Sequence, residues 1–202
     1  MMNTDDIDYT CNKMNRMKRL FAAIKVHPEE KLLNLYDELK ASLRHEKIKW
    51  VDEKNIHVTL KFFGETPESH IDTICKTLDD VASLHEPLIL KLQNIGIFGS
   101  KYKPRVIWFG MEKNPAIEIL AKDIIQRLDG AGFPHDGQNF RAHLTVGRIR
   151  FINEKRNFQQ SIDLFKDVFI QNIRVKEFEL YESKLRPRGP EYTVVENFKL
   201  GN

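Results

Sequence analysis

Two short segments of the chain carry a histidine followed two residues later by a threonine. NIHVTLKF holds His57 and Thr59, and FRAHLTVGR holds His143 and Thr145. Imidazole titrates close to neutral pH, so one histidine can accept a proton while the other donates one. A threonine hydroxyl can donate a hydrogen bond to a phosphate oxygen without adding charge. Two such pairs around one phosphorus atom would hydrolyse a phosphodiester without a metal ion.

Both segments alternate polar with apolar residues, which is typical of a β-strand with one buried face. The first segment would present four polar residues on one face and four apolar residues on the other: Asn55, His57, Thr59 and Lys61 against Ile56, Val58, Leu60 and Phe62. The second would repeat this split, with His143 and Thr145 on its polar face. Each histidine and its threonine therefore project together from one strand.

A zinc ion is the main chemical alternative, because the two histidines could be two of its ligands. Such a site needs one or two more ligands, and neither strand has a carboxylate two residues from its histidine. His135 is the best remaining candidate ligand. We therefore expect no metal and no other cofactor.

The two segments belong to an internal repeat. His143 follows His57 by 86 residues (143 − 57), and Arg105 follows Arg19 by the same number (105 − 19). Each copy would form a strand, a helix, a second strand, the His-x-Thr strand, a helix and a hairpin. Two copies that shield each other predict an α+β fold with two lobes related by a pseudo-twofold axis. Each lobe would hold an antiparallel sheet, with helices outside and a central cleft between the lobes.

The hydrophobic patterns predict where the elements lie. Strands are expected at 18–26, 48–51, 56–63, 88–98, 105–111, 140–149, 169–183 and 192–200. Helices are expected at 27–46, 66–84, 114–132 and 153–165.

Composition indicates an ordinary globular protein, with 41% hydrophobic and 30% charged residues among 202. We expect a flexible extension over 1–16 and a single two-lobed domain over 17–202. The chain has two cysteines and no CxxC motif, so we expect neither a zinc ribbon nor a redox motif, and a reducing cytoplasm as its location. Because it has no long apolar run, we expect no contact with a membrane. The net charge is only +3, but basic clusters such as SKYKPR and SKLRPRGP suit a phosphate-bearing partner.

Taken in order, KRLFAAI, WVDEKNIHVTLKFFGE, PRVIWFG, FRAHLTVGR and ELYESKLRPRGPEY resemble the two-histidine (2H) phosphoesterase superfamily. Within it they are similar to the bacterial and archaeal RNA 2′,3′-cyclic phosphodiesterases, once described as 2′–5′ RNA ligases. The resemblance implies metal-independent hydrolysis of RNA 2′,3′-cyclic phosphate ends to 2′-phosphates, with reversible 2′–5′ ligation. It also implies that His57 is the proton donor and His143 the proton acceptor, with Thr59 and Thr145 on the substrate phosphate.

The resemblance further implies a phosphate-binding role for Arg148. In a regular strand Arg148 would face away from His143, because five residues separate them. We therefore expect an irregularity near Gly147 that reverses the alternation. Phe21 is an aromatic candidate beside the cleft, although it could equally belong to the core.

We expect a monomer that binds RNA ends bearing a 2′,3′-cyclic phosphate and needs no obligate protein partner. Two other readings keep the same histidines. One is a phosphodiesterase for a 2′–5′ oligonucleotide or a cyclic nucleotide, and the other is an RNA-binding module without catalysis.

Overall fold

The computed structural model describes residues 16–100, 103–134, 137, 139–187 and 189–201. The expected extension over 1–16 therefore lies almost wholly outside the described residues, and so does His135. The strands are β1 (Met17–Lys25), β2 (Lys47–Trp50), β3 (His57–Pro67), β4 (Leu88–Ser100), β5 (Lys103–Met111), β6 (His143–Phe151), β7 (Phe169–Val175), β8 (Glu177–Arg186) and β9 (Gly189–Lys199). The helices are α2 (Glu30–Ser42), α3 (Ile71–Ala82), α4 (Pro115–Gly130) and α5 (Lys155–Asp163), with 3-10 turns at Glu53–Asn55 and Glu68–His70.

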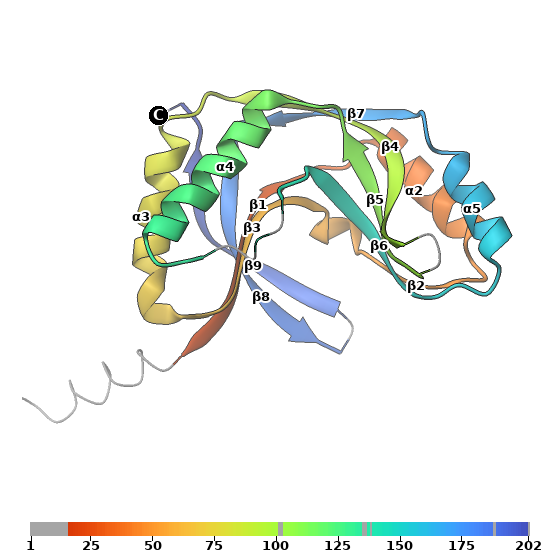
Figure 1. Cartoon of the computed structure of the whole chain (residues 1–202), viewed down its shortest axis with the longest axis horizontal. Coiled ribbons are helices and arrows are strands. Elements are labelled where there is room, and N and C mark those ends of the chain that lie inside the picture. The colour runs from red at the N-terminus through yellow and green to blue at the C-terminus, as the bar shows by residue number, and fades with distance from the viewer. Residues whose placement is uncertain (1–15, 101–102, 135–136, 138, 188, 202) are drawn as a thin grey trace, which may run out of the picture.

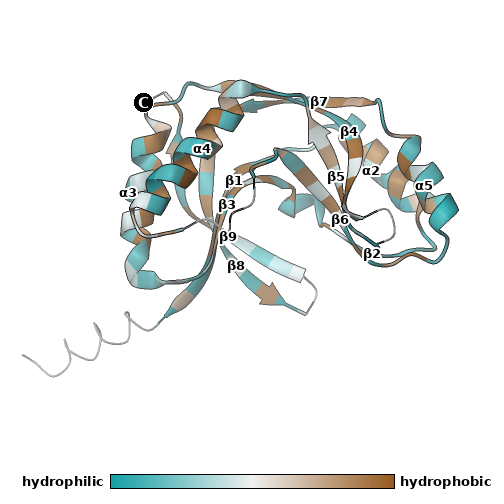
Figure 2. Ribbon diagram, in the orientation of Figure 1, coloured by the Kyte–Doolittle hydropathy of each residue, from teal (hydrophilic) through white to brown (hydrophobic). Residues whose placement is uncertain are grey.

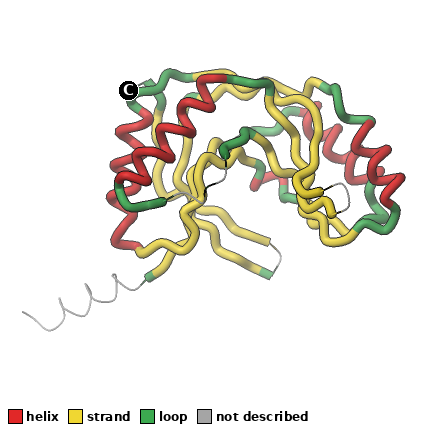
Figure 3. Tube along the Cα trace, in the orientation of Figure 1, coloured by secondary structure: helices red, strands yellow, loops and turns green. Residues whose placement is uncertain are grey.

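The strands form two antiparallel sheets. The first sheet has the order β3-β1-β8-β9, and the second has the order β2-β6-β5-β4-β7. Helices α3 and α4 pack against strands of the first sheet, and α2 packs with α5 beside β7 and β4 of the second. Figure 1 shows each sheet with its helices on the outer side, and Figure 3 shows the same division between helix and strand. The expected α+β architecture of two helix-covered antiparallel sheets is confirmed.

The chain passes between the two sheets several times. β1 and β3 belong to the first sheet, although β2 between them belongs to the second. β4 to β7 then complete the second sheet, and β8 and β9 belong to the first again. The expected single strand over 169–183 is therefore wrong. β7 pairs with β4 and β8 pairs with β1, which belong to different sheets, so the chain bends at Lys176 to change sheet.

Local chemistry explains where the helices begin. Asn114 caps α4, because its side-chain oxygen accepts hydrogen bonds from the backbone N–H groups of Ala116 (3.0 Å) and Ile117 (3.4 Å). Pro115 then occupies the first helical position, where a missing N–H costs little. The α3 helix begins later than expected, because 66 and 67 still belong to β3. Among the described helices, none has both the length and the apolar content that crossing a bilayer would need.

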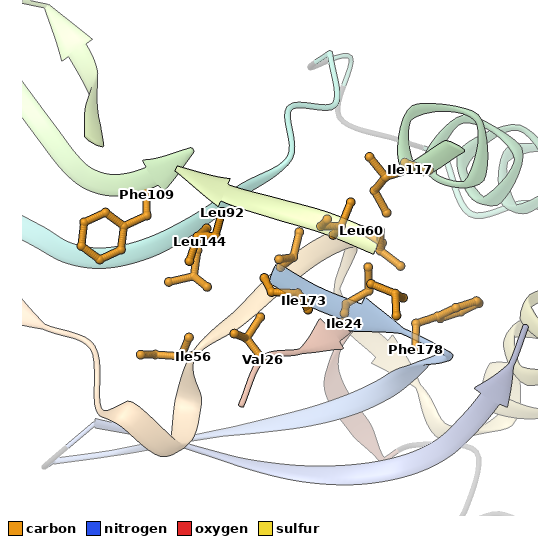
Figure 4. Packing of buried hydrophobic residues seen from close by; sticks show 14 of the residues in the cluster. Ile24, Val26, Ile56, Leu60, Leu92, Phe109, Ile117, Leu144, Ile173 and Phe178 are labelled. Atoms are coloured by element: carbon orange, nitrogen blue, oxygen red, sulfur yellow. The ribbon is translucent and has the colours of Figure 1, made fainter. Parts of the chain in front are cut away.

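One hydrophobic core joins both halves of the molecule. Its buried residues come from the first sheet (Leu60), from α4 (Ile117) and from the second sheet (Leu144). Figure 4 shows these side chains together, and Figure 2 shows hydrophobic residues interspersed with hydrophilic ones along the helices that cover the sheets. The spacing of the buried residues in α4 fits one face of a helix: Ile117, Leu120, Ala121, Ile124 and Leu128.

The internal repeat is visible in the strand pairing, with one correction. β3 and β6 have the same burial sequence over their first four residues, which preserves the 86-residue offset between His57 and His143. Lys25 pairs with His57, however, and Gly110 pairs with His143, so β1 and β5 are offset by 85 residues (110 − 25). The expected equivalence of Arg19 and Arg105 is therefore wrong by one residue.

Two leucines on β8 offer a matched test of the core. Leu180 is completely buried and Leu185 is 71% exposed. We expect Leu180→Ala to lower the free energy of unfolding by about 2–5 kcal/mol, because it removes buried methyl groups and leaves a cavity. Leu185→Ala should change it by less than about 0.5 kcal/mol. Urea denaturation measures both, and equal losses would contradict this packing.

Candidate active site

The two His-x-Thr strands carry their polar residues on one face. His57, Thr59, His143 and Thr145 are all half-buried, whereas the residues between and after them lie in the core. The two strands belong to different sheets but contact each other. We call these two polar surfaces the histidine faces.

Each His-x-Thr strand contains one extra residue immediately after its threonine. In β3, Ala23 pairs with Thr59 and Ala22 pairs with Lys61, which leaves Leu60 without a partner. In β6, Trp108 pairs with Thr145 and Ile107 pairs with Gly147, which leaves Val146 without one. These are β-bulges at equivalent places in the repeat. The irregularity expected near Gly147 is thus confirmed, and it recurs in the other copy.

The bulges reverse the alternation of the residues that follow. Arg148 becomes exposed, and its charge acts on both His57 and His143. In the first copy the expected faces of Lys61 and Phe62 are therefore wrong. Phe62 is 60% exposed and its ring lies 5.9 Å from the Phe21 ring, while Lys61 is buried with its Nζ 4.0 Å from Asp129 of α4.

Two neighbours stabilise the bulge in β6. The hydroxyl of Tyr36 on α2 donates to the carbonyl of Val51 at 2.6 Å and also lies 3.1 Å from the carbonyl of Val146. The backbone N–H of Val51 donates to the same Val146 carbonyl at 2.9 Å. A Cβ atom at Gly147 would lie only 2.9 Å from a methyl group of Ile48, so glycine allows β2 to pack closely here. Helix α2 therefore helps to position Arg148.

A backbone hydrogen bond fixes the orientation of each imidazole. Nδ1 of His57 lies 2.7 Å from the carbonyl oxygen of Asn55, and Nδ1 of His143 lies 2.7 Å from that of Arg141. A carbonyl oxygen can only accept, so Nδ1 must carry the hydrogen in both rings. Nε2 of each ring is therefore the nitrogen that is free to gain or lose a proton. The Asn55 side chain donates in turn to the carbonyl of Pro190 at 2.9 Å, which ties the 3-10 turn before β3 to β9.

Aromatic rings enclose both histidines. The ring centroids of Phe21 and Tyr192 lie 5.0 Å and 5.4 Å from that of His57. Those of Phe98 and Trp108 lie 4.8 Å and 6.5 Å from that of His143. His57 also lines a pocket of about 260 Å³ with Tyr192. These aromatic side chains cover part of each imidazole and make its surroundings less polar.

The surroundings lower the pKa of both histidines. Burial is the largest cause in each case, and the hydrogen bond to the carbonyl opposes it. The positive charge of Arg148 lowers both pKa values further, and a charge on His143 lowers that of His57. Two protonated imidazoles are thus disfavoured, and the pair passes through a state with one proton. Since unfolded histidines titrate near 6.5, the unfolded chain binds more protons below that pH, and the folded state loses stability as the pH falls.

Thr59 and Thr145 complete the set of polar groups. Their hydroxyls make no hydrogen bond within the described part of the chain, so both can donate to a ligand. Two hydroxyls, two imidazoles and the Arg148 guanidinium suit a tetrahedral anion such as phosphate. No cluster of three or more histidine, cysteine or carboxylate side chains suited to a metal ion occurs among the described residues.

Sequence reasoning missed several residues around the histidines. Phe21 was recognised as a candidate, and it is 2% exposed and stacked on Tyr181 with its ring 5.1 Å away. Tyr192, Phe98 and Trp108 were not recognised, because they come from strands distant in the sequence. Trp108 lies within the apolar run VIWFGM, in which alternation does not indicate which residues face the histidines.

The fold and the histidine faces define a phosphoesterase of the two-histidine type, and the comparisons agree. The model of the family described as LigT like Phosphoesterase matches residues 24–108 and 111–192, and each segment contains one His-x-Thr strand. The chain belongs to this family, as its motifs predicted.

Relatives in the family include two archaeal proteins, each named RNA 2′,3′-cyclic phosphodiesterase. The protein from Methanocaldococcus jannaschii is 34% identical over 89% of this chain and 99% of its own length. That from Archaeoglobus fulgidus is 31% identical over 90% and 99%. A crystal structure of a Thermus thermophilus protein has a TM-score of 0.73 at 25% identity, covering 91% of this chain and 98% of the other. E. coli LigT complexed with 3′-AMP has the same fold, with a TM-score of 0.71 at 21% identity over 93% and 100%.

The lowered pKa values can be measured by NMR. In the free protein we expect the imidazoles of His57 and His143 both to titrate below about 6.5, because burial and Arg148 disfavour their charged forms. Inorganic phosphate should raise both pKa values, since an anion favours imidazolium. The variants His57→Gln and His143→Gln assign the signals. A titration of either ring above 6.5 without an added anion would contradict the described surroundings.

Proposed function

We propose that this protein is an RNA 2′,3′-cyclic phosphodiesterase, which hydrolyses the cyclic phosphate at an RNA end to a 2′-phosphate. One observation carries the proposal. Two imidazoles on contacting strands are both locked through Nδ1 to a backbone carbonyl, and each shares its strand face with a threonine whose hydroxyl makes no hydrogen bond among the described residues. The names of the archaeal relatives support the choice of substrate.

The proposed mechanism divides acid and base between the histidines. His143 accepts a proton from water through Nε2 while the water oxygen attacks phosphorus. The bond from phosphorus to the ribose 3′ oxygen breaks, and that oxygen takes a proton from Nε2 of His57. The assignment of donor and acceptor rests on the family resemblance, because both rings have the same hydrogen-bond arrangement.

The remaining polar groups would bind the phosphate. Thr59 and Thr145 can each donate to a non-bridging oxygen, which holds the phosphorus between the histidines. The Arg148 guanidinium would stabilise the negative charge that grows on these oxygens in the transition state. Burial, together with this charge, keeps the pKa of both imidazoles low in the free protein.

The proposal extends to the setting in which the enzyme acts. Its substrate is an RNA end, its location the cytoplasm and its working form a monomer without an obligate protein partner. A parallel reaction, in which an RNA 5′ hydroxyl attacks the cyclic phosphate in place of water and the bond from phosphorus to the 3′ oxygen breaks, would give a 2′–5′ ligase activity.

Substitution of the histidines tests the proposal. With a chelator present, the unaltered protein should convert an oligonucleotide 2′,3′-cyclic phosphate to a 2′-phosphate. His57→Ala and His143→Ala should each lower the rate by roughly 10²–10⁴-fold, because each removes a general acid or base. His27→Ala is the matched control, since His27 is exposed and outside the histidine faces. RNA binding without turnover in the unaltered protein would instead favour a binding module.

The pH dependence of the rate gives an independent test. kcat/KM reflects the free enzyme and requires one protonated and one neutral imidazole. Because the pKa of both is lowered from 6.5, we expect kcat/KM to be greatest below that pH and to fall as the pH rises above it. In kcat, measured with bound anionic substrate, the decline should move to higher pH. A kcat/KM that increases steadily above neutral pH would contradict the proposal.

A further inference from the structure

A row of basic side chains continues from Arg148 along the end of β6 and the neighbouring strand β2. β2 reads KIKW and the end of β6 reads RIRF, so each alternates basic with apolar residues. The four cations are Lys47, Lys49, Arg148 and Arg150, and all four are exposed. We call them the basic strip. Figure 1 shows β2 and β6 side by side at the edge of the second sheet.

The strand register places the basic strip on the second histidine face. Arg148 lies on this face because of the bulge before it, and Lys49 is its direct partner across the strands. Lys47 and Arg150 each lie two residues further along their own strands, and residues two apart share a face. The basic strip therefore leads away from the histidines toward the end of β6.

An exposed aromatic ring lies at the far end of the basic strip. Phe151 is 58% exposed and pairs with Lys47, while Arg150 has no partner in β2. This second bulge in β6 sets Arg150 and Phe151 together opposite one lysine. Proteins hold single-stranded nucleic acid with this combination, because cations bind the phosphates and an aromatic ring stacks on a base.

The basic strip is unfavourable for the protein alone. Like charges directly opposite each other on neighbouring strands repel, and Lys49 and Arg148 are such a pair. None of the four cations forms an ion pair within the described part of the chain. The nearby carboxylate of Glu46 accepts hydrogen bonds from the backbone N–H groups of Asn153 and Glu154 instead. A bound anion would relieve the repulsion.

Protection of a sheet edge does not account for the basic strip. Lysines on an edge strand discourage pairing with another molecule, which would explain Lys47 and Lys49 on β2. Arg148 and Arg150 lie on β6, however, which is paired with β2 on one side and β5 on the other. Their charges therefore need another explanation.

The internal repeat shows that the strand architecture does not require these charges. By the 86-residue offset, Arg148 and Arg150 correspond to Phe62 (148 − 86) and Gly64 (150 − 86) in β3. The net charge of the whole chain is only +3, so four cations on two short strands are a local concentration of positive charge. Such a concentration favours a partner with several negative charges.

We infer that the basic strip and Phe151 bind the RNA strand behind its cyclic phosphate end, with the cations on backbone phosphates and the ring on a base. The inference rests on the proposed function and deepens it, because it makes polymeric RNA a better substrate than a mononucleotide. With the strand's end at the histidines, its preceding phosphates can reach the strip that begins at Arg148. Phosphates and base faces occur in every RNA, so binding should not depend on sequence.

Binding of an RNA that cannot react tests the basic strip directly. The probe is a fluorescently labelled octamer of uridine with a 3′ hydroxyl end, measured by anisotropy at several KCl concentrations. Arg150→Gln should weaken binding by roughly tenfold. It should also reduce the slope of log K against log [KCl] by about 0.7, the value for one phosphate contact of a single strand. Phe151→Ala should weaken binding by roughly fivefold or more without changing the slope.

Two residues of β7 supply matched controls. Arg174 and Phe169 are exposed on the same sheet, outside the basic strip. Arg174→Gln and Phe169→Ala should change neither the affinity nor the slope. An unchanged slope in Arg150→Gln, or an equal loss in Arg174→Gln, would overturn the inference. Loss of binding to phosphatidylserine vesicles in Arg150→Gln, with octamer binding intact, would assign the strip to a membrane surface and overturn it too.

Kinetics separates this inference from the proposed function. The two substrates are an oligonucleotide ending in a 2′,3′-cyclic phosphate and uridine 2′,3′-cyclic phosphate. The ratio of their kcat/KM values should fall by roughly five- to tenfold in Arg150→Gln and Phe151→Ala. An unchanged ratio, while the unaltered protein hydrolyses both substrates, would overturn the inference and leave the proposed function standing. If neither substrate is hydrolysed while the octamer results hold, the proposed function fails and RNA binding by the strip stands.

Discussion

One unpaired residue in each His-x-Thr strand determines what the two histidine faces carry. A regular strand would turn Arg148 into the core, where an uncompensated guanidinium is very unfavourable. The extra residue Val146 brings it instead to the side of the imidazoles. The bulge persists because its carbonyl is bonded by the Val51 amide and contacted by Tyr36. Helix α2, on the outer side of the second sheet, thereby helps to hold the bulge that brings Arg148 to the histidine face.

The repeat keeps the backbone and varies the side chains. Both copies share the bulge and the Nδ1 hydrogen bond. Yet Phe62 stands where the other copy has Arg148, and Lys61 stands where the other has Gly147. In the proposed mechanism an acid and a base need the same reach to phosphorus but different surroundings. A shared backbone with different side chains at these positions would meet both requirements.

The sequence predicted features that depend on local alternation, and it missed those that depend on distant strands. The shared face of His57 and Thr59 followed from strand periodicity, and Gly147 signalled the bulge in β6. The equivalent bulge in β3 has no glycine beside it, so the faces of Lys61 and Phe62 were misassigned. The bend at Lys176 and the aromatic walls of the histidines reflect which strands become neighbours, which periodicity does not encode.

Each copy of the repeat contributes strands to both sheets. One copy therefore does not correspond to one sheet with its helices. β1 lies between β3, from its own copy, and β8, from the other. A fragment holding the first copy alone would leave one side of β1 with unpaired backbone groups, which is a template for aggregation. The second copy covers that edge with β8. Each copy of the repeat therefore depends on the other for a complete sheet, and neither is a folding unit by itself.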